Sequence, residues 1–192
     1  RIKTSKNLPM FTSCSPGWIN YIEQYEPEML SNLSTAKSPQ QMGGIVAKHH
    51  FAYELGYKIE DIVFVSIMPC IAKKHEAARP EMEYEGIRDV DHVLTTREYA
   101  RMLKRMNIDF MNLEDSFPHG RIARYTGAGI IFGVSGGVME GALRTVSEVL
   151  GEEQGAIDFK DVRGSAEIKE ATYTIMGTEI NVAVVHGGSS IK

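Results

Sequence analysis

Residues 12–18 read Thr-Ser-Cys-Ser-Pro-Gly-Trp, and residues 68–76 read Met-Pro-Cys-Ile-Ala-Lys-Lys-His-Glu. These first and second cysteine segments hold the chain's two cysteines, Cys14 and Cys70, each within two residues of a proline. Proline fixes its own φ and restricts the residue before it, so the cysteine side chains are held in defined directions. Two cysteines on separate stiff turns are typical of an iron–sulfur or reactive-thiol site.

The two segments resemble the first two signature motifs of the iron-only (FeFe) hydrogenase large subunit, which read Thr-Ser-Cys-Cys-Pro-x-Trp and Met-Pro-Cys-x-x-Lys-x-x-Glu. The resemblance continues at residues 32–41 (Asn-Leu-Ser-Thr-Ala-Lys-Ser-Pro-Gln-Gln) and 132–140 (Phe-Gly-Val-Ser-Gly-Gly-Val-Met-Glu). It therefore covers most of the chain. It implies an enzyme that reversibly reduces protons to H₂.

The composition is that of a globular protein. The chain has 192 residues, of which 43% are hydrophobic and 24% charged, with a net charge of −4. This length suits one medium domain or two small lobes. Interspersed acids and bases argue against a nucleic-acid surface, and no apolar run reaches the length of a membrane span. Two cysteines are too few for a secreted disulfide framework. We expect a cytoplasmic protein, with the periplasm as the alternative because some members of this family are periplasmic.

The first half of the chain predicts two helices and a strand. An amphipathic helix is expected over residues 18–31, with Pro27 able to break it. Ser38 and Pro39 start a second helix, which runs to about Leu55 and is closed by Gly56. Residues 61–68 are almost continuously apolar and predict a buried strand, whose carboxyl end carries Cys70. Residues 79–89 are expected to form a loop.

The second half of the chain also alternates between predicted strands and predicted helices. We expect a short strand at 92–94, then a helix to about Met106 capped by Thr95 or Thr96 with Glu98 in its first turn. Residues 107–120 are expected to be irregular, residues 127–137 are glycine-rich, and a helix follows over 138–150. Residues 172–177 and 179–185 predict paired strands. The fold class is therefore α/β, with parallel or mixed sheets flanked by helices, like the iron-only hydrogenase catalytic domain. We expect residues 1–192 to be a single partial catalytic domain, in one or two lobes, that lacks the N- and C-terminal parts of the family domain.

The resemblance also implies a cofactor. In the family, the H-cluster joins a 4Fe–4S cubane through a cysteine sulfur to a di-iron unit with CO, CN⁻ and a dithiolate bridge. Four cysteines hold the cubane, and Ser15 and Cys70 stand at two of their positions. The other two belong to a third motif, which residues 1–192 do not contain. Serine oxygen is a harder, poorer ligand for iron–sulfur clusters than thiolate. We therefore expect the chain as given to bind no cluster and to be inactive by itself.

Three residues match proton-transfer or polar roles in the family. Cys14 matches the acid that passes a proton to the bridgehead amine of the di-iron unit, Lys73 the lysine that donates to a cyanide ligand, and Ser34 a serine on the proton path. In an alternative register Cys14 is the ligand and Ser15 replaces the proton carrier. A small thiol filling space is the plain alternative for Cys14.

The other matches belong to the cofactor pocket of the family. Capping and core packing are the plain alternatives for these residues, and a pairing with Lys73 or a backbone contact is an alternative for the glutamate. The residues that match the cofactor pocket of the family are Ser38, Gln40, Met68, Pro69, Phe132 and Glu76.

The partners implied are ferredoxin or another electron-transfer subunit or domain, and the hydrogenase maturation proteins. A second function is open, because relatives with this fold act in iron–sulfur protein assembly or as binding proteins, and a lost ligand cysteine suits them. Lys73, Gln40 and Phe132 favour a hydrogenase, since a protein without the di-iron unit has little reason to keep them.

Overall fold

The computed structural model describes residues 6–117, 126–151 and 157–190. The chain divides into two compact units, with the boundary between Ser116 and Phe117. Each unit mixes helices with strands, so the α/β class predicted from the sequence is confirmed. The predicted irregular segment 107–120 is described only to residue 117, where it contains a 3₁₀ helix at Phe110–Asn112.

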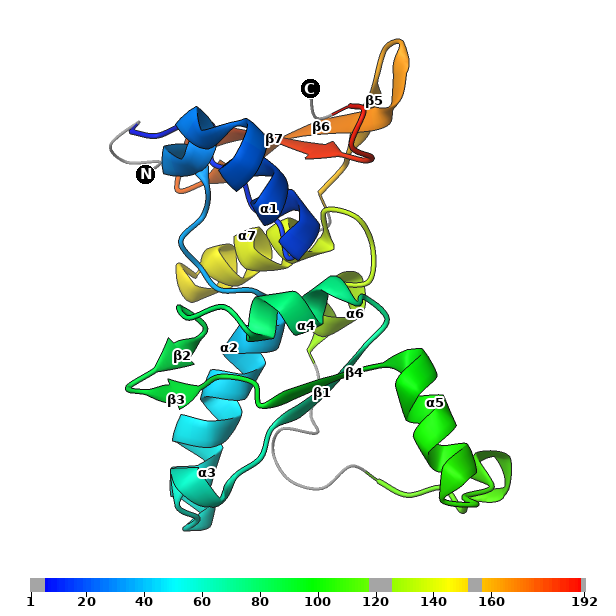
Figure 1. Cartoon of the computed structure of the whole chain (residues 1–192). Coiled ribbons are helices and arrows are strands. Elements are labelled where there is room, and N and C mark those ends of the chain that lie inside the picture. Colours follow the sequence, from blue (N-terminus) through cyan, green and yellow to red (C-terminus); the bar gives the residue numbers. More distant parts are fainter. Residues whose placement is uncertain (1–5, 118–125, 152–156, 191–192) are drawn as a thin grey trace. The chain divides into compact units, whose positions relative to one another are not determined.

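The first unit begins with the helix that follows the first cysteine segment (Figure 1). Helix α1 spans Pro16–Tyr25, and a 3₁₀ helix at Pro27–Asn32 follows it, so Pro27 breaks the helix as predicted. The next helical stretch comprises α2 (Pro39–Ile45), a π-helical turn (Val46–Phe51) and α3 (Ala52–Leu55). Gly56 closes it in a left-handed conformation with φ 74°. Both the proline start and the glycine end were predicted from the sequence.

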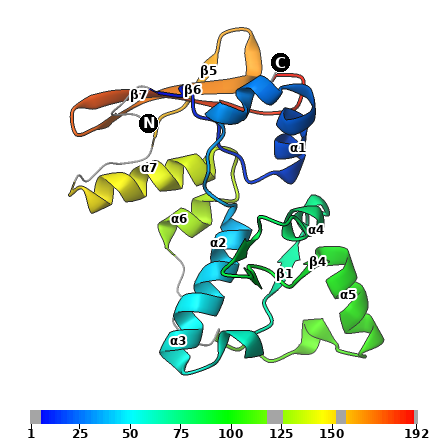
Figure 2. The same cartoon turned by 60° about the vertical axis from the view of Figure 1, so that its left-hand side comes forward.

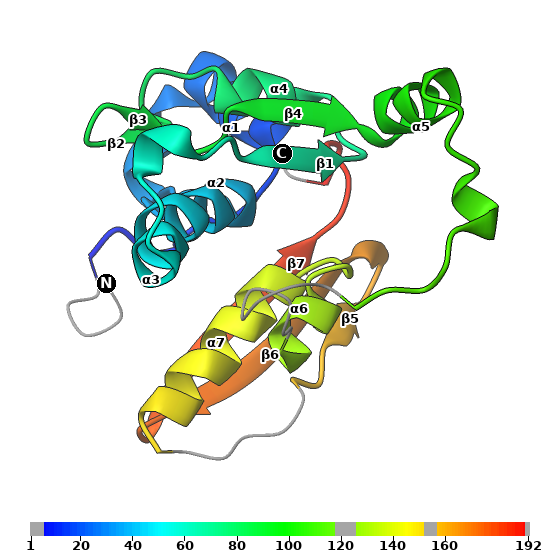
Figure 3. The same ribbon diagram turned by 90° about the horizontal axis from the view of Figure 1, so that it is seen from below.

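A parallel two-stranded sheet carries the second cysteine segment (Figure 3). Strand β1 (Val65–Met68) pairs with β4 (His92–Thr95), in a register that places Val65 opposite His92 and Met68 opposite Thr95. Helix α4 (Ala72–Ala77) follows β1, and α5 (Thr96–Arg105) follows β4. Of the two caps predicted for α5, Thr95 and Thr96, the structure has Thr95, which forms a capping box with Glu98.

Two predictions for this region are wrong. Strand β1 is shorter than predicted, because Ile59–Asp61 form a 3₁₀ helix and the amide of Phe64 donates to the Asp91 side chain instead of a neighbouring strand. It is not buried on both faces either: Ser66 faces Gln40 of α2, whereas Val65 is 46% exposed. The predicted loop 79–89 contains a small hairpin of β2 (Glu83–Tyr84) and β3 (Ile87–Arg88).

The core of the first unit lies between α4 and β4. Ala77, Val90 and Val93 are buried there, and Phe64 and Met68 pack against them. Helix α2 approaches this region closely at Gly44, where a Cβ atom would lie 2.0 Å from the carbonyl oxygen of Asp89. The absence of a side chain therefore lets α2 reach the segment that leads into β4.

The second unit is a helix on an antiparallel sheet (Figure 2). Helices α6 (Gly127–Ile131) and α7 (Gly137–Val149) precede strands β5 (Lys160–Val162), β6 (Ser165–Ile175) and β7 (Thr178–Val185). The pairing of β6 with β7 was predicted, but β6 starts earlier than expected and β5 was missed. The core consists of Ile157, Tyr173 and Ile175, against which Leu143 of α7 packs.

Candidate functional site at the two cysteine segments

The first cysteine segment is a turn fixed by local contacts. The amide of Ser15 donates to the hydroxyl of Ser13 at 3.1 Å, and Pro16 then occupies the first turn of α1. Trp18 meets Phe11 edge-on, with ring centroids 6.1 Å apart. Cys14 is exposed on this turn.

The second cysteine segment leaves the sheet and enters a helix. Strand β1 ends at Met68, and Pro69 and the exposed Cys70 follow before α4 begins at Ala72. Met68 is partly buried against the core, whereas Pro69 is exposed. The first turn of α4 then directs Lys73 inward, where only 6% of the residue is exposed.

Lys73 joins the two segments. Its Nζ atom donates to the backbone carbonyl oxygen of Cys14 at 2.5 Å, and it lies 3.0 Å and 3.1 Å from the two carboxylate oxygens of Glu76. These three acceptors match the three hydrogens of the ammonium group. The contact brings together two segments that lie 59 residues apart in the sequence.

The Glu76 carboxylate is the centre of a buried polar network. Besides Lys73, it accepts hydrogen bonds from Ser38 at 2.8 Å and Gln41 at 3.3 Å, both on the amino-terminal side of α2. Glu76 is 6% exposed and Gln41 fully buried. The network leaves no net charge, because the ammonium and the carboxylate neutralise each other, as a buried ion pair requires.

Gln40 extends the network to the sheet. Its amide nitrogen lies 3.5 Å from the carbonyl oxygen of Lys73 and from Glu76, and its amide oxygen accepts from the Ser66 hydroxyl at 2.9 Å. Gln40 therefore contacts both α4 and β1. These are the two elements that flank Cys70.

Ser34 and Phe132, two other predicted site residues, have local contacts of their own. Ser34 is placed by a backbone bond from its amide to Phe11, and its hydroxyl accepts from the amide of Ala36 at 3.3 Å. Phe132 belongs to the second unit, where it packs under α7 so closely that a Cβ atom on Gly141 would lie 2.8 Å from its ring.

Gln41 and Ser66 were missed in the sequence analysis. Gln41 follows Gln40 and lies three residues after Ser38, so helical spacing could have indicated that it shares a face with Ser38. Ser66 carried no signal, because a hydroxyl inside an apolar run says nothing about its partner. A further buried cation, Lys48, was also unforeseen; its Nζ atom lies 2.7 Å from Asp91 Oδ2.

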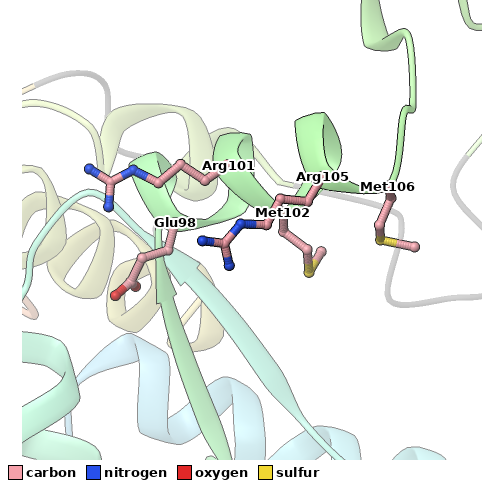
Figure 4. A pocket seen from close by; sticks show the side chains of 5 residues that line it. All are labelled: Glu98, Arg101, Met102, Arg105 and Met106. Carbon is pink, nitrogen blue, oxygen red and sulfur yellow. The ribbon is translucent and has the colours of Figure 1, made fainter.

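Glu23 and Glu98 have lowered pKa values. The hydrogen bonds from Arg79 hold the pKa of Glu23 below its usual value. Hydrogen bonds from Lys74 and then Thr95 lower the pKa of Glu98 to about 2. Glu98 also lines a hollow of about 270 Å³ on α5, with Arg101, Met102, Arg105 and Met106 (Figure 4). None of the predicted site residues lines this hollow.

Comparison with known proteins shows the family. The family model described as "Iron only hydrogenase large subunit, C-terminal domain" matches residues 1–192. The chain belongs to this family. It is 50% identical to the periplasmic Fe hydrogenase large subunit of Nitratidesulfovibrio vulgaris over 191 residues, which cover 99% of this chain and 45% of that protein. It is 47% identical to iron hydrogenase 1 of Clostridium pasteurianum, covering 100% of this chain and 33% of that protein.

The structural comparison agrees with the sequence comparison. The apo FeFe hydrogenase HydA1 from Chlamydomonas reinhardtii, in a variant form, matches with a TM-score of 0.71 and 39% identity over 88% of this chain and 42% of that chain. Protein NAR1 of Arabidopsis thaliana is also similar, at 33% identity over 96% of this chain and 42% of that protein. The hydrogenases are thus the more similar relatives. The chain spans less than half the length of these relatives.

The residues present do not by themselves fit the cofactor of the family. A 4Fe–4S cluster is held by four thiolates, and the whole sequence contains two cysteines. Among the described residues, no group of three or more histidine, cysteine, aspartate or glutamate side chains could hold a metal ion.

Across the same described residues, no helix is long and apolar enough to cross a membrane.

Proposed function

We propose that this chain is part of the catalytic domain of an iron-only hydrogenase, which reversibly reduces protons to H₂. The observation that carries the proposal is the buried Lys73–Glu76 pair at the Cys14 carbonyl. It brings the two cysteine segments together through residues that match the family motifs. The sequence identity of about half to two hydrogenases over nearly the whole chain supports the same function.

The resemblance suggests a role for each of the main side chains. Cys14 is exposed and can carry a proton, with Ser34 further along the proton path. By the resemblance, Cys70 would be one thiolate ligand of the cubane, and Ser15 stands at the position of another. By the resemblance, Lys73 would donate to an anionic ligand, and one of its three present acceptors would then have to be released. Because the chain lacks four thiolates, we propose that residues 1–192 alone bind no cluster and evolve no H₂.

The electron partner and the location belong to this proposal. A ferredoxin or a nicotinamide-linked subunit is the electron donor we propose, since a relative from Solidesulfovibrio fructosivorans is a subunit of an NADP-reducing hydrogenase. Hydrogenase maturation proteins are the other partners. We place the protein in the cytoplasm; the periplasm is the alternative, because one relative is named as periplasmic.

An iron–sulfur assembly factor is the second candidate. Ser15 favours it, because an assembly factor does not need the full ligand set of the H-cluster. A relative from Xenopus tropicalis that is named as a cytosolic Fe–S cluster assembly factor is 34% identical over 97% of this chain. The buried cation of Lys73 favours the hydrogenase. A polar network that surrounds a lysine is costly to keep unless the charge has a use.

A chimera tests the two candidates. This chain replaces the matching 192-residue stretch of Clostridium pasteurianum iron hydrogenase 1, and H₂ evolution is measured after anaerobic maturation. The chimera with Ser15→Cys should evolve H₂. The chimera that retains Ser15 should evolve no more H₂ than a control chimera that carries both Ser15→Cys and Cys70→Ala. A Ser15→Cys chimera that binds iron at the parent's stoichiometry and yet evolves no H₂ would favour the assembly candidate.

The cofactor proposal has its own test on the unmodified chain. After anaerobic incubation with the maturation proteins, iron and acid-labile sulfide are measured. We expect neither above the level of a Cys14→Ala, Cys70→Ala double variant. Stoichiometric iron and sulfide in the unmodified chain would show that it can assemble a cluster despite having two cysteines.

A further inference from the structure

Two contacts of different character link α1 and the turn before it to α4 and the residues just after it. At the start of α1, Lys73 of α4 donates to the carbonyl oxygen of Cys14. At the far end of α1, the guanidinium of Arg79 forms two bonds to the Glu23 carboxylate, at 2.5 Å and 3.0 Å. Lys73 and Glu76 side chains are each 8% exposed, whereas the Glu23 side chain is 35% exposed. The Lys73–Glu76 pair is therefore largely shielded from water, the bond from Lys73 to the Cys14 carbonyl oxygen is partly buried, and the Arg79–Glu23 contact is exposed.

Burial makes the first contact the more persistent of the two. An ammonium with all three hydrogens accepted inside the protein has no water to replace a lost acceptor, so releasing the Cys14 carbonyl leaves an unsatisfied buried donor. An exposed ion pair exchanges its partner for water at little cost. The start of α1 should therefore be held more firmly than its end.

The contact is itself held from a third element. Ser38 and Gln41 of the α2 region donate to Glu76, which fixes the carboxylate and so the direction in which Lys73 points. All of these groups are side chains or backbone of this chain. The hydrogen bonds from Ser38, Gln41 and Lys73 to Glu76 are all formed within the chain, although the buried Oε1 atom of Gln41 has no hydrogen-bond partner.

We propose that Lys73 and Glu76, held by Ser38 and Gln41, form a clasp that fixes the backbone of the first cysteine segment before any cofactor binds. Lys73 is thus a positioning residue for Cys14 in addition to the polar role that the resemblance suggests, and Gln41 is a positioning residue for Glu76. The inference deepens the proposed function, because it explains how the Cys14 turn is pre-organised for that site. It predicts that the turn is ordered in the cofactor-free chain.

Amide hydrogen exchange of the 192-residue chain tests the clasp. Lys73→Met keeps most of the alkyl stem and removes the donor. The order of residues 12–18 is read from the hydrogen-bonded amides of Ser15 and Ile19, which donate to the Ser13 hydroxyl and the Ser15 carbonyl oxygen. We expect exchange of these two amides to rise at least ~10-fold, while exchange in α5 stays unchanged, because local opening is confined to the segment that loses its anchor. Gln41→Leu should give a smaller rise in the same residues. Lys73→Arg, which can still donate to both acceptors, should restore part of the protection.

Two matched variants separate the clasp from general loosening. Lys74→Met removes the neighbouring lysine, which donates to the carbonyl oxygen of Val93, and should leave residues 12–18 unchanged. Arg79→Met releases the other end of α1 and should raise exchange in residues 21–26 only. Since Lys73→Met leaves Glu76 unpaired, a Lys73→Met, Glu76→Gln double variant removes both charges and keeps the experiment informative if the single variant misfolds.

The clasp is overturned if residues 12–18 exchange as in the wild type in both the single and the double variant. It is also overturned if exchange rises equally in residues 12–18, residues 21–26 and α5, because the pair would then contribute only general stability. Neither result depends on H₂ evolution. Failure of the clasp and failure of the proposed function are therefore distinguishable.

Discussion

Glu76 shows how one buried carboxylate organises the site at the scale of single residues. It accepts hydrogen bonds from Lys73, Ser38 and Gln41, and its charge is the counterion of the Lys73 ammonium. A buried ion pair of this kind contributes little net stability against an apolar core, but removing one partner leaves the other charge uncompensated. Lys73 and Glu76 therefore depend on each other.

Glu76→Gln should lower the free energy of unfolding by ~3–5 kcal/mol, because the Lys73 ammonium stays buried without a counterion. The measurement is urea unfolding followed by the fluorescence of Trp18, the single tryptophan of the chain. Glu81→Gln is the control. The Glu81 side chain is 51% exposed beside Arg79, so its loss should cost at most ~1 kcal/mol. Equal effects of the two substitutions would contradict the buried-pair interpretation.

A second residue-scale prediction concerns two adjacent glycines in α2. Gly44→Ala places a Cβ atom 2.0 Å from the Asp89 carbonyl oxygen, so the helix must move, at a cost of ~1–3 kcal/mol. Gly43→Ala meets nothing closer than Phe64, at 4.0 Å, and should stabilise the helix by up to ~1 kcal/mol. Urea midpoints of the two variants should thus shift in opposite directions. Similar shifts in one direction would argue against the close approach of α2 to Asp89.

Helix ends are what the sequence predicts best at the scale of elements. Pro39, Gly56 and the Thr95–Glu98 capping box act through their own backbone and immediate neighbours, so their effect can be read locally. The first helix was predicted over residues 18–31, and it begins two residues earlier, at Pro16. Short strands depend instead on a partner from elsewhere in the chain. That is why the β2–β3 hairpin and β5 were missed, and why β1 was predicted too long.

The start of α5 should be sensitive to acid. Hydrogen bonds from Lys74 and Thr95 lower the pKa of Glu98 from 4.5 to about 2, so the folded state favours the ionised carboxylate. The stability it adds is fully present above pH 4.5 and is lost as the pH falls from there towards about 2. Glu98→Gln should therefore have a lower urea midpoint than the wild type at pH 6, and this difference should shrink at pH 3. A difference of the same size at both pH values would contradict the prediction.

For the whole molecule, the sequence allowed local motifs to be recognised, but it did not allow the contacts between distant segments to be predicted. The two cysteine segments, Lys73 and the family were recognisable because their residues stand in fixed local patterns, and the family match covers residues 1–192. The partners within the site were not recognisable. Which acceptor Lys73 takes, and that Gln41 and Ser66 complete the network, depend on how α1, α2, α4 and β1 pack.

The infrared spectrum of the Ser15→Cys chimera after maturation tests the central claim most directly, because CO and CN⁻ ligands absorb where protein does not. Bands of these ligands should appear in the Ser15→Cys chimera, and Lys73→Met should shift the CN⁻ bands, since the resemblance implies that Lys73 would donate to a cyanide ligand. A folded chimera with a full complement of iron but no CO or CN⁻ bands would contradict the assignment of this chain to a hydrogenase catalytic domain.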